Sequence, residues 1–425
     1  AKGPGLRAGL LSSNSTRKKG IVTCYDLPLS ILSFLNIKTQ GAYNGYPLES
    51  TPGDWRSVIT EQNKLMVNYN LRWPLLTGYA YLLIGIFLAG IIGLIFGFKR
   101  NLIRGLQGGY LFLVTFPVVF LLESLADPLN WAGITLWTLG LSGLIFTCSF
   151  LGTGRNLFKT LAVLSWITVA AIISDGLFNG YCELKSFLGY SAVAGARFYG
   201  IGNEYMGFLL GSYIVAISLS LSQIKRYSSQ ILWLAVFLIT IILIHPGLGA
   251  SIGGGVTAFV GLSITTCLWL KRPLRLKMMI QLAVALIIIF SLVAFWDYYL
   301  NRNSMTHFGQ LITSLTNGNF RVLGEMVSRK LQLNLRLINY SIWGRVLIGI
   351  LIAVPLIYKR PPQAIAGFFD KYPEITRGFL GLVITAIVGL VINDSGIVTA
   401  ATMFIFGIIM LFIAIAGESG SQTNQ

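Results

Sequence analysis

Long apolar runs follow one another from Trp73 almost to the end of the chain, and short polar stretches separate them. An apolar helix of about 20 residues spans the hydrocarbon core of a bilayer. The pattern therefore predicts an all-α polytopic membrane protein with about eleven transmembrane helices. We place these helices at approximately 75–98, 105–124, 131–151, 157–175, 205–222, 230–246, 251–270, 278–297, 342–358, 378–393 and 397–416.

Stretches that depart from this pattern set the expected domain boundaries. Residues 1–72 are polar, contain several Gly and Pro residues, and have no spanning run, so we expect an extracytoplasmic segment there. A transmembrane domain follows over 73–417. The polar tail 418–425 is expected to be disordered.

An outer interfacial segment, 298–341, interrupts the transmembrane domain. Its later part mixes apolar positions with Arg321, Arg329, Lys330 and Arg336. This composition is typical of an amphipathic helix that lies at the membrane surface with its cations near lipid phosphates. A solvated helix packed under the outer segment is the alternative.

The charge of the chain indicates its orientation in the membrane. The formal net charge is +17, which in a soluble domain would suggest a nucleic-acid partner. Here the basic residues gather in alternate loops, and the positive-inside rule assigns such loops to the cytoplasm. We therefore expect no nucleic-acid partner, a multi-pass protein of the plasma (inner) membrane, an extracytoplasmic N-terminal segment and a cytoplasmic C-terminus. The pattern does not predict an oligomeric state.

The four cysteines do not indicate a metal centre. The sequence has no CxxC motif and no Cys/His cluster, so it predicts neither a zinc site nor a disulfide framework. We expect no cofactor in this chain. Cys24 and Cys182 fall on the same expected side of the membrane, and a disulfide between them stays open.

Polar residues that the topology does not explain gather at the outer ends of the expected spans. A charged group beside hydrocarbon is costly unless it pairs or lines a polar cavity, so it defaults to a functional hypothesis. We predict a shared polar cavity near the outer leaflet, with the candidate residues Asp175, Arg197, Tyr199, Asn203, Glu204, His245, Asn393, Asp394 and Ser395. The alternative treats each residue as a turn, a helix end or a helix cap.

A glycine-rich stretch from Pro246 to Thr257 opens the expected seventh span. Backbone amides at a helix N-terminus can hold an anion such as phosphate. Gly247, Gly249, Gly253 and Gly254 are the candidate anion-binding residues. Close helix packing through small residues explains the same pattern equally well.

The N-terminal segment contains Gly20-Ile-Val-Thr-Cys-Tyr-Asp-Leu-Pro-Leu-Ser-Ile-Leu-Ser-Phe-Leu-Asn-Ile37, followed by Gly45-Tyr-Pro-Leu48. We expect a strand, a turn with Asp26 as N-cap, and a short helix. This stretch resembles the closing segment of alkaline-phosphatase-superfamily domains, the branch of sulfatases, phosphodiesterases and phosphoglycerate mutases. The resemblance implies a two-metal catalytic centre. Its ligands cannot be placed on this sequence, so it implies that catalytic residues and divalent metals belong to a domain upstream of Ala1.

Two elements of the membrane half carry a second resemblance. Ala196-Arg-Phe-Tyr-Gly-Ile-Gly-Asn203 and Asp394-Ser-Gly396 are similar to elements of bacterial multispanning proteins in which a phosphatase-like outer domain precedes many helices. That resemblance names no reaction. The layout also resembles that of ethanolamine-phosphate transferases acting on glycolipids, by architecture only.

Together these observations favour the membrane domain of a cell-envelope phosphohydrolase or phosphotransferase acting on a lipid-linked or glycan phosphate. The bundle would bind the lipid part near the outer leaflet, and Arg197 would pair with the phosphate. One alternative is a transporter or flippase that uses Arg197, Glu204 and Asp394, with Arg197 and Glu204 as a gated ion pair. A structural membrane subunit is the second alternative.

Overall fold

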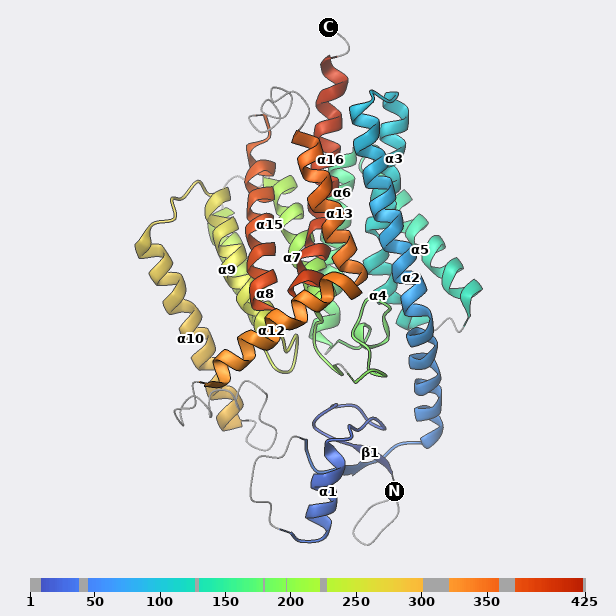
Figure 1. The fold of residues 1–425 in the computed structure, drawn as a ribbon, viewed down its shortest axis with the longest axis vertical. Helices are drawn as coiled ribbons and strands as arrows, with labels where there is room; N and C mark the ends of the chain where they lie inside the picture. The colour runs from blue at the N-terminus through green and yellow to red at the C-terminus, as the bar shows by residue number, and fades with distance from the viewer. Residues whose placement is uncertain are drawn as a thin grey trace.

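The chain forms a bundle of long helices with a small N-terminal segment at one end (Figure 1). The structure is a computed structural model that describes residues 9–37, 45–126, 130–178, 180–195, 197–221, 228–300, 321–358 and 371–422. The expected all-α class is confirmed, since helices make up most of the described chain and its one sheet has two short strands.

Each expected span coincides with a helix or a helix pair of the bundle. The helices are α2 (Trp55–Ile95), α3 (Arg100–Val114), α4 (Phe116–Ala126), α5 (Trp131–Gly152), α6 (Leu157–Leu177), α7 (Asn203–Ser220), α8 (Ser228–Ile244), α9 (Ile252–Trp269), α10 (Leu276–Leu300), α12 (Arg321–Tyr340), α13 (Ile342–Tyr358), α15 (Pro373–Ile392) and α16 (Gly396–Gln422).

Length and apolar composition qualify seven helices of the described chain as membrane spans, with α3 and α4 taken as one. The number becomes eight if α12 and α13, which meet at an 80° bend, are also taken as one. The protein is therefore membrane-embedded and multispanning, and eleven crossings stay a prediction.

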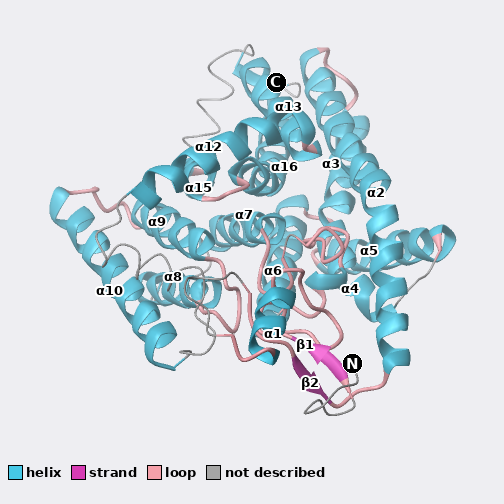
Figure 2. Cartoon of the chain, turned by 60° about the horizontal axis from the view of Figure 1, so that its bottom comes forward, coloured by secondary structure: helices cyan, strands magenta, loops and turns pink. Residues whose placement is uncertain are grey.

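Helices α7 and α16 form the centre of the bundle. Figure 2 shows α7 surrounded by α6, α9, α15 and α16, and α7 is buried from Tyr205 to Ser218. Gly207 and Gly211, one turn apart, face α16, and a side-chain carbon at Gly211 would lie 2.6 Å from the Met403 carbonyl oxygen. Small residues allow this close approach of two apolar helices.

The N-terminal segment is built around Asp26. Strand β1 (Leu10–Ser12) pairs antiparallel with β2 (Glu49–Thr51), and α1 (Asp26–Phe34) lies between them in sequence. Asp26 is fully buried, and its carboxylate accepts hydrogen bonds from Ser15 Oγ at 2.5 Å, from the Thr23 amide and hydroxyl at 2.8 Å each, and from the Tyr46 amide at 2.9 Å.

These contacts change the role expected for Asp26. It is the first residue of α1 rather than its N-cap, which is Tyr25, and its side chain joins separate loops of the segment. Burial alone raises the pKa of Asp26, but the hydrogen bonds from Ser15, Thr23 and Tyr46 outweigh it and lower that pKa below its usual value.

Helix boundaries differ from the expected domain boundaries at both ends of the chain. Helix α2 begins at Trp55 and crosses the expected limit at residue 72 without a break, even though it contains Pro74. Helix α16 continues through Gln422, into the tail that was expected to be disordered.

The interfacial segment 298–341 is described in part. Residues 301–320 lie outside the described chain, and α12 covers 321–340. Leu331 and Leu335 of α12 are exposed, whereas Lys330 and Asn334 contact the turn between α15 and α16. The helix is thus amphipathic as expected, with its polar contacts on the protein side.

Basic loops collect at one end of the bundle. The loops between α2 and α3 and between α9 and α10 lie opposite the N-terminal segment (Figure 1). They carry Lys99 and the pair Lys271 and Arg272. This grouping is the one expected from the charge pattern, although the orientation of the termini relative to the membrane stays a prediction.

Candidate functional site

The connection between α6 and α7 covers the end of the bundle that faces the N-terminal segment. Its short 3-10 helix, η1 (Glu183–Lys185), is held by Asp175 from the last turns of α6. One Asp175 oxygen accepts the Cys182 amide at 2.7 Å, and the other accepts the Glu183 amide at 3.0 Å. Both oxygens of this buried carboxylate therefore fix the loop.

Glu183 is a buried carboxylate that the sequence reasoning missed. Its side chain accepts a hydrogen bond from the Gly202 amide at 2.5 Å. Burial raises the pKa of Glu183 well above its usual value; the Gly202 amide opposes this, and the charge of Asp175 adds to it. The sequence feature that could have identified Glu183 is its place in a short loop before the glycine-rich stretch.

Arg197 joins two glycine-rich loops through their backbones. Its guanidinium donates to the carbonyl oxygens of Ile201 at 2.8 Å, Gly249 at 3.2 Å and Ala250 at 2.5 Å. The Ile201 amide also donates to Gly249 at 2.8 Å. Gly200 has φ of +81°, and a side chain there would collide with the Gly249 carbonyl, so glycine is required at this crossing.

Glu204 pairs with a residue that the sequence reasoning did not single out. Its carboxylate lies 3.3 Å from the guanidinium of Arg72 in α2, and both side chains are largely buried. The transporter alternative expected Glu204 to pair with Arg197, whose hydrogen bonds instead go to backbone carbonyls. No sequence signal connects Arg72 with Glu204, because they are far apart along the chain.

The N-terminal segment docks onto these loops through Arg17. Its guanidinium donates to the Pro246 carbonyl at 2.5 Å and lies 4.0 Å from the centre of the Tyr199 ring. Next to Pro246, His245 accepts the Gly247 amide at its Nδ1, at 3.1 Å. Tyr199 and the Pro246 turn thus form a docking platform for the outer segment.

Asn393, Asp394 and Ser395 belong to a neighbouring cluster at the turn between α15 and α16. The buried Asn393 amide donates to Thr257 Oγ1 and to the Gly389 carbonyl, each at 2.9 Å. Asp394 pairs with Lys330 at 3.5 Å. The carbonyl of Ser395 accepts the amides of Val398 and Thr399 in the first turn of α16, at 3.0 and 3.2 Å.

A weak link connects the two clusters. The Thr399 hydroxyl donates to the Asn203 carbonyl at 3.5 Å. All predicted cavity residues therefore lie at the same end of the bundle. They are divided among separate contacts, and each charged residue has its own partner.

Three of the four candidate anion-binding glycines donate their amides within the protein. The amide of Gly247 donates to His245, that of Gly249 to the Ile242 carbonyl, and that of Gly254 to Ser251 Oγ, the N-cap of α9. A side chain at Gly253 would press on the Asn393 side chain. These contacts are those expected under the close-packing alternative.

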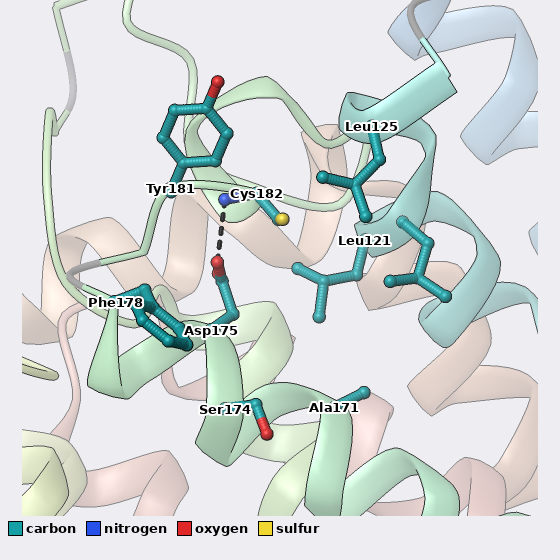
Figure 3. A pocket seen from close by; sticks show the side chains of 9 residues that line it. Leu121, Leu125, Ala171, Ser174, Asp175, Phe178, Tyr181 and Cys182 are labelled. Atoms are coloured by element: carbon teal, nitrogen blue, oxygen red, sulfur yellow. Dashed lines mark hydrogen bonds between the residues drawn. The ribbon is translucent and has the colours of Figure 1, made fainter.

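An apolar cavity of about 450 Å³ opens between the C-terminal ends of α4 and α6 (Figure 3). Its size falls within the range of about 300–1,000 Å³ typical of small-molecule sites. The lining residues are Leu121, Leu122, Leu125, Ala171, Ser174, Asp175, Phe178, Tyr181 and Cys182. Asp175 is thus a polar group on an otherwise largely hydrocarbon wall. Of the predicted candidates, it is the one that lines this cavity.

One cationic group, Lys185, contacts Tyr181, a residue that lines this cavity. The Lys185 ammonium is 4.5 Å from the Tyr181 ring centre, donates to the Tyr181 hydroxyl at 3.2 Å and pairs with Glu61 at 2.9 Å. Burial opposes the charged form of Lys185, yet its bonds to Glu61 and Tyr181 raise its pKa overall. In the N-terminal segment, burial lowers the pKa of Lys18, and the charge of Asp175 opposes this shift.

The cysteines and the remaining carboxylates form no metal site in the described part of the chain, where no three His, Cys, Asp or Glu side chains come together to hold an ion. Cys24 and Cys182 are both free, so the disulfide left open by the sequence is not formed.

The reasoning from sequence also missed Glu123, a buried carboxylate of α4 within an otherwise apolar run. Its position inside an expected span was the available signal.

Compared with protein-family models, with curated proteins and with solved structures, the chain matches none of them. The resemblance of Gly20–Ile37 to the alkaline phosphatase superfamily therefore stays a prediction.

Proposed function

We propose that this chain is the membrane domain of a cell-envelope phosphohydrolase or phosphotransferase, and that it binds the lipid part of a lipid-linked phosphate substrate in the cavity between α4 and α6. The cavity is the observation that supports this proposal. Its wall is almost entirely apolar, which suits hydrocarbon, because each Å² of apolar surface removed from water contributes about 25 cal/mol.

The position of the cavity also supports a lipid ligand. Leu125 and Phe178 line it and are 63% and 77% exposed, so its mouth opens on the surface where lipid would contact the bundle. Under the predicted orientation this end lies at the outer leaflet, beside the N-terminal segment. The phosphoryl chemistry rests on the resemblance of Gly20–Ile37, and any divalent metals would act outside the residues described.

The transporter alternative has less support from the contacts of its residues. It requires Arg197, Glu204 and Asp394 to act together in one polar cavity. Arg197 is hydrogen-bonded to backbone carbonyls, Glu204 pairs with Arg72, and Asp394 pairs with Lys330. The largely apolar lining of the α4/α6 cavity is also unlike the path of a polar cargo.

A bulky substitution at the cavity mouth tests the proposal. Ser174 is exposed and lines the cavity, so Ser174→Trp fills the mouth without disturbing the core. Leu177 is on the same helix and 54% exposed but does not line the cavity, and Leu177→Trp is the matched control. Native mass spectrometry of the protein released from lipid nanodiscs measures retained lipid.

We expect Ser174→Trp to lose a lipid that the wild-type protein and Leu177→Trp both retain. Equal retention by all three proteins would contradict the proposal.

A further inference from the structure

We propose that Tyr181 controls entry to the α4/α6 cavity, and that the ion pair between Glu61 and Lys185 holds Tyr181 in position. This inference rests on the proposed function and adds how the lipid site admits its ligand. Tyr181 would be a movable wall of the cavity, and Glu61 and Lys185 would act through it as positioning residues.

Helix α2 is longer than a membrane crossing requires. Its 41 residues extend over about 60 Å at 1.5 Å per residue, whereas the hydrocarbon core of a bilayer is about 30 Å thick. Its first part, residues 55–72, which we call the α2 arm, runs beyond the bundle toward the N-terminal segment (Figure 1). Asp54 caps the arm by accepting the Arg56 amide at 3.2 Å. The arm is therefore a continuous helical connection between the N-terminal segment and the bundle.

One face of the α2 arm contacts the loops at the end of the bundle. Glu61, Asn68 and Arg72 are separated by seven and four residues, a spacing that places them on the same side of a helix. The Glu61 carboxylate lies 2.9 Å from the Lys185 ammonium, and the Asn68 amide donates to the Lys185 carbonyl oxygen. Arg72 pairs with Glu204 at the start of α7. The side chain and the backbone of Lys185 are thus both bound to the arm.

Lys185 connects the α2 arm to the cavity. Its ammonium donates to the Tyr181 hydroxyl at 3.2 Å and lies 4.5 Å from the centre of the Tyr181 ring. Tyr181 lines the cavity, and Figure 3 shows it across the opening from Leu125. The Tyr181 side chain is exposed, and exposed side chains change rotamer within nanoseconds unless a contact holds them. The contact with the buried Lys185 therefore decides where the ring lies.

The pair between Glu61 and Lys185 can open without unfolding the protein. Lys185 is buried, whereas the Glu61 side chain is partly exposed to water, and ion pairs that reach water are weak. When the Glu61 carboxylate moves away, the Lys185 ammonium loses its counter-charge in a buried position, which favours its movement toward water. Tyr181 then loses the fixed partner of its hydroxyl and can rotate away from the cavity.

Cys182 provides a reporter of entry to the cavity. It lines the cavity, and its sulfur points into it (Figure 3). Cys24 and Cys148 are exposed and are replaced by serine, whereas Cys267 is buried and can stay. The rate of labelling by a pyrenyl maleimide then measures how readily an apolar reagent enters. The experiment uses the full chain in lipid nanodiscs, with and without dodecanol as the ligand probe.

We expect Glu61→Gln to be labelled about fivefold faster than the parent protein, which is roughly the factor that a partly exposed ion pair contributes to an equilibrium. Tyr181→Ala should be labelled at least as fast. Adding Glu61→Gln to Tyr181→Ala should change nothing further, because both substitutions act through the same side chain. Gln62→Ala is the matched control and should keep the parent rate, since Gln62 is the exposed neighbour of Glu61.

An unchanged labelling rate in Glu61→Gln would overturn the inference. An acceleration by Glu61→Gln that persists in full in the Tyr181→Ala protein would also overturn it, because the pair would then only brace the loop. Dodecanol tests the proposed function separately, and protection of Cys182 by dodecanol would leave that function standing in both cases. Labelling that dodecanol slows in none of the variants would contradict the proposed function and the inference together.

Discussion

Arg197 is expected to act as a clamp between the glycine-rich loops 197–202 and 245–251. Its guanidinium makes three hydrogen bonds to carbonyl oxygens of these loops, between 2.5 and 3.2 Å long. Hydrogen bonds from a charged group contribute about 1.5–3 kcal/mol each. Bonds made by one side chain are not additive, so we expect Arg197→Ala to cost about 2–4 kcal/mol.

Hydrogen exchange at the Ile201 amide measures this cost directly. That amide donates to the Gly249 carbonyl and is therefore protected only while the loops stay together. A cost of 2–4 kcal/mol corresponds to exchange that is about 30- to 900-fold faster. Arg197→Lys should fall between the wild-type protein and Arg197→Ala, because one ammonium lacks the planar fork that reaches several carbonyls.

Arg56→Ala provides the control for this prediction. Arg56 is exposed near the start of α2, far from the two loops in sequence. Its removal should leave the exchange of Ile201 unchanged, as surface substitutions usually change stability by less than about 0.5 kcal/mol. If Arg197→Ala folds and the Ile201 amide keeps its full protection, the guanidinium does not hold the loops together.

Two further predictions concern the bundle centre and the N-terminal segment. Gly211→Ala should lower the free energy of unfolding by about 1–3 kcal/mol, because the added carbon meets the Met403 backbone. Gly78→Ala should leave that free energy unchanged, because a side-chain carbon at Gly78 would have no neighbouring atom within 4 Å. Similar thermal unfolding of both variants would refute the close α7–α16 contact. The lowered pKa of Asp26 stabilises the segment above about pH 3.9, and this contribution is lost as pH falls through the lower native pKa. Limited proteolysis of the N-terminal segment between pH 6 and 3 should show this loss. Asp26→Asn should be cleaved readily already at pH 6. Identical cleavage profiles of Asp26→Asn and the wild-type protein would refute the stabilising role of the Asp26 carboxylate.

The helix positions could be predicted from sequence because each depends on a local property. A long apolar run forms a helix in the membrane wherever it packs, since its backbone polar groups must be satisfied internally. The polar candidates also gather at one end of the bundle, because successive spans alternate in direction. Asp175, Arg197 and Asn393 are examples that the structure places at this end.

The partners of these residues could not be predicted, because they depend on packing between distant elements. Arg197 bonds to backbone carbonyls, which every sequence has, and Glu204 pairs with Arg72 from another helix. The cavity between α4 and α6 could not be predicted for a related reason. Leu121 and Leu125 face it, but a leucine that lines a cavity looks the same in sequence as one that faces lipid.

The most direct test of the lipid-binding account is a cryo-electron microscopy map of the protein in lipid nanodiscs. The account predicts elongated non-protein density between α4 and α6 that touches Leu121 and Leu125. A cavity without such density, or one closed by its own side chains while surrounding lipids are visible, would contradict it.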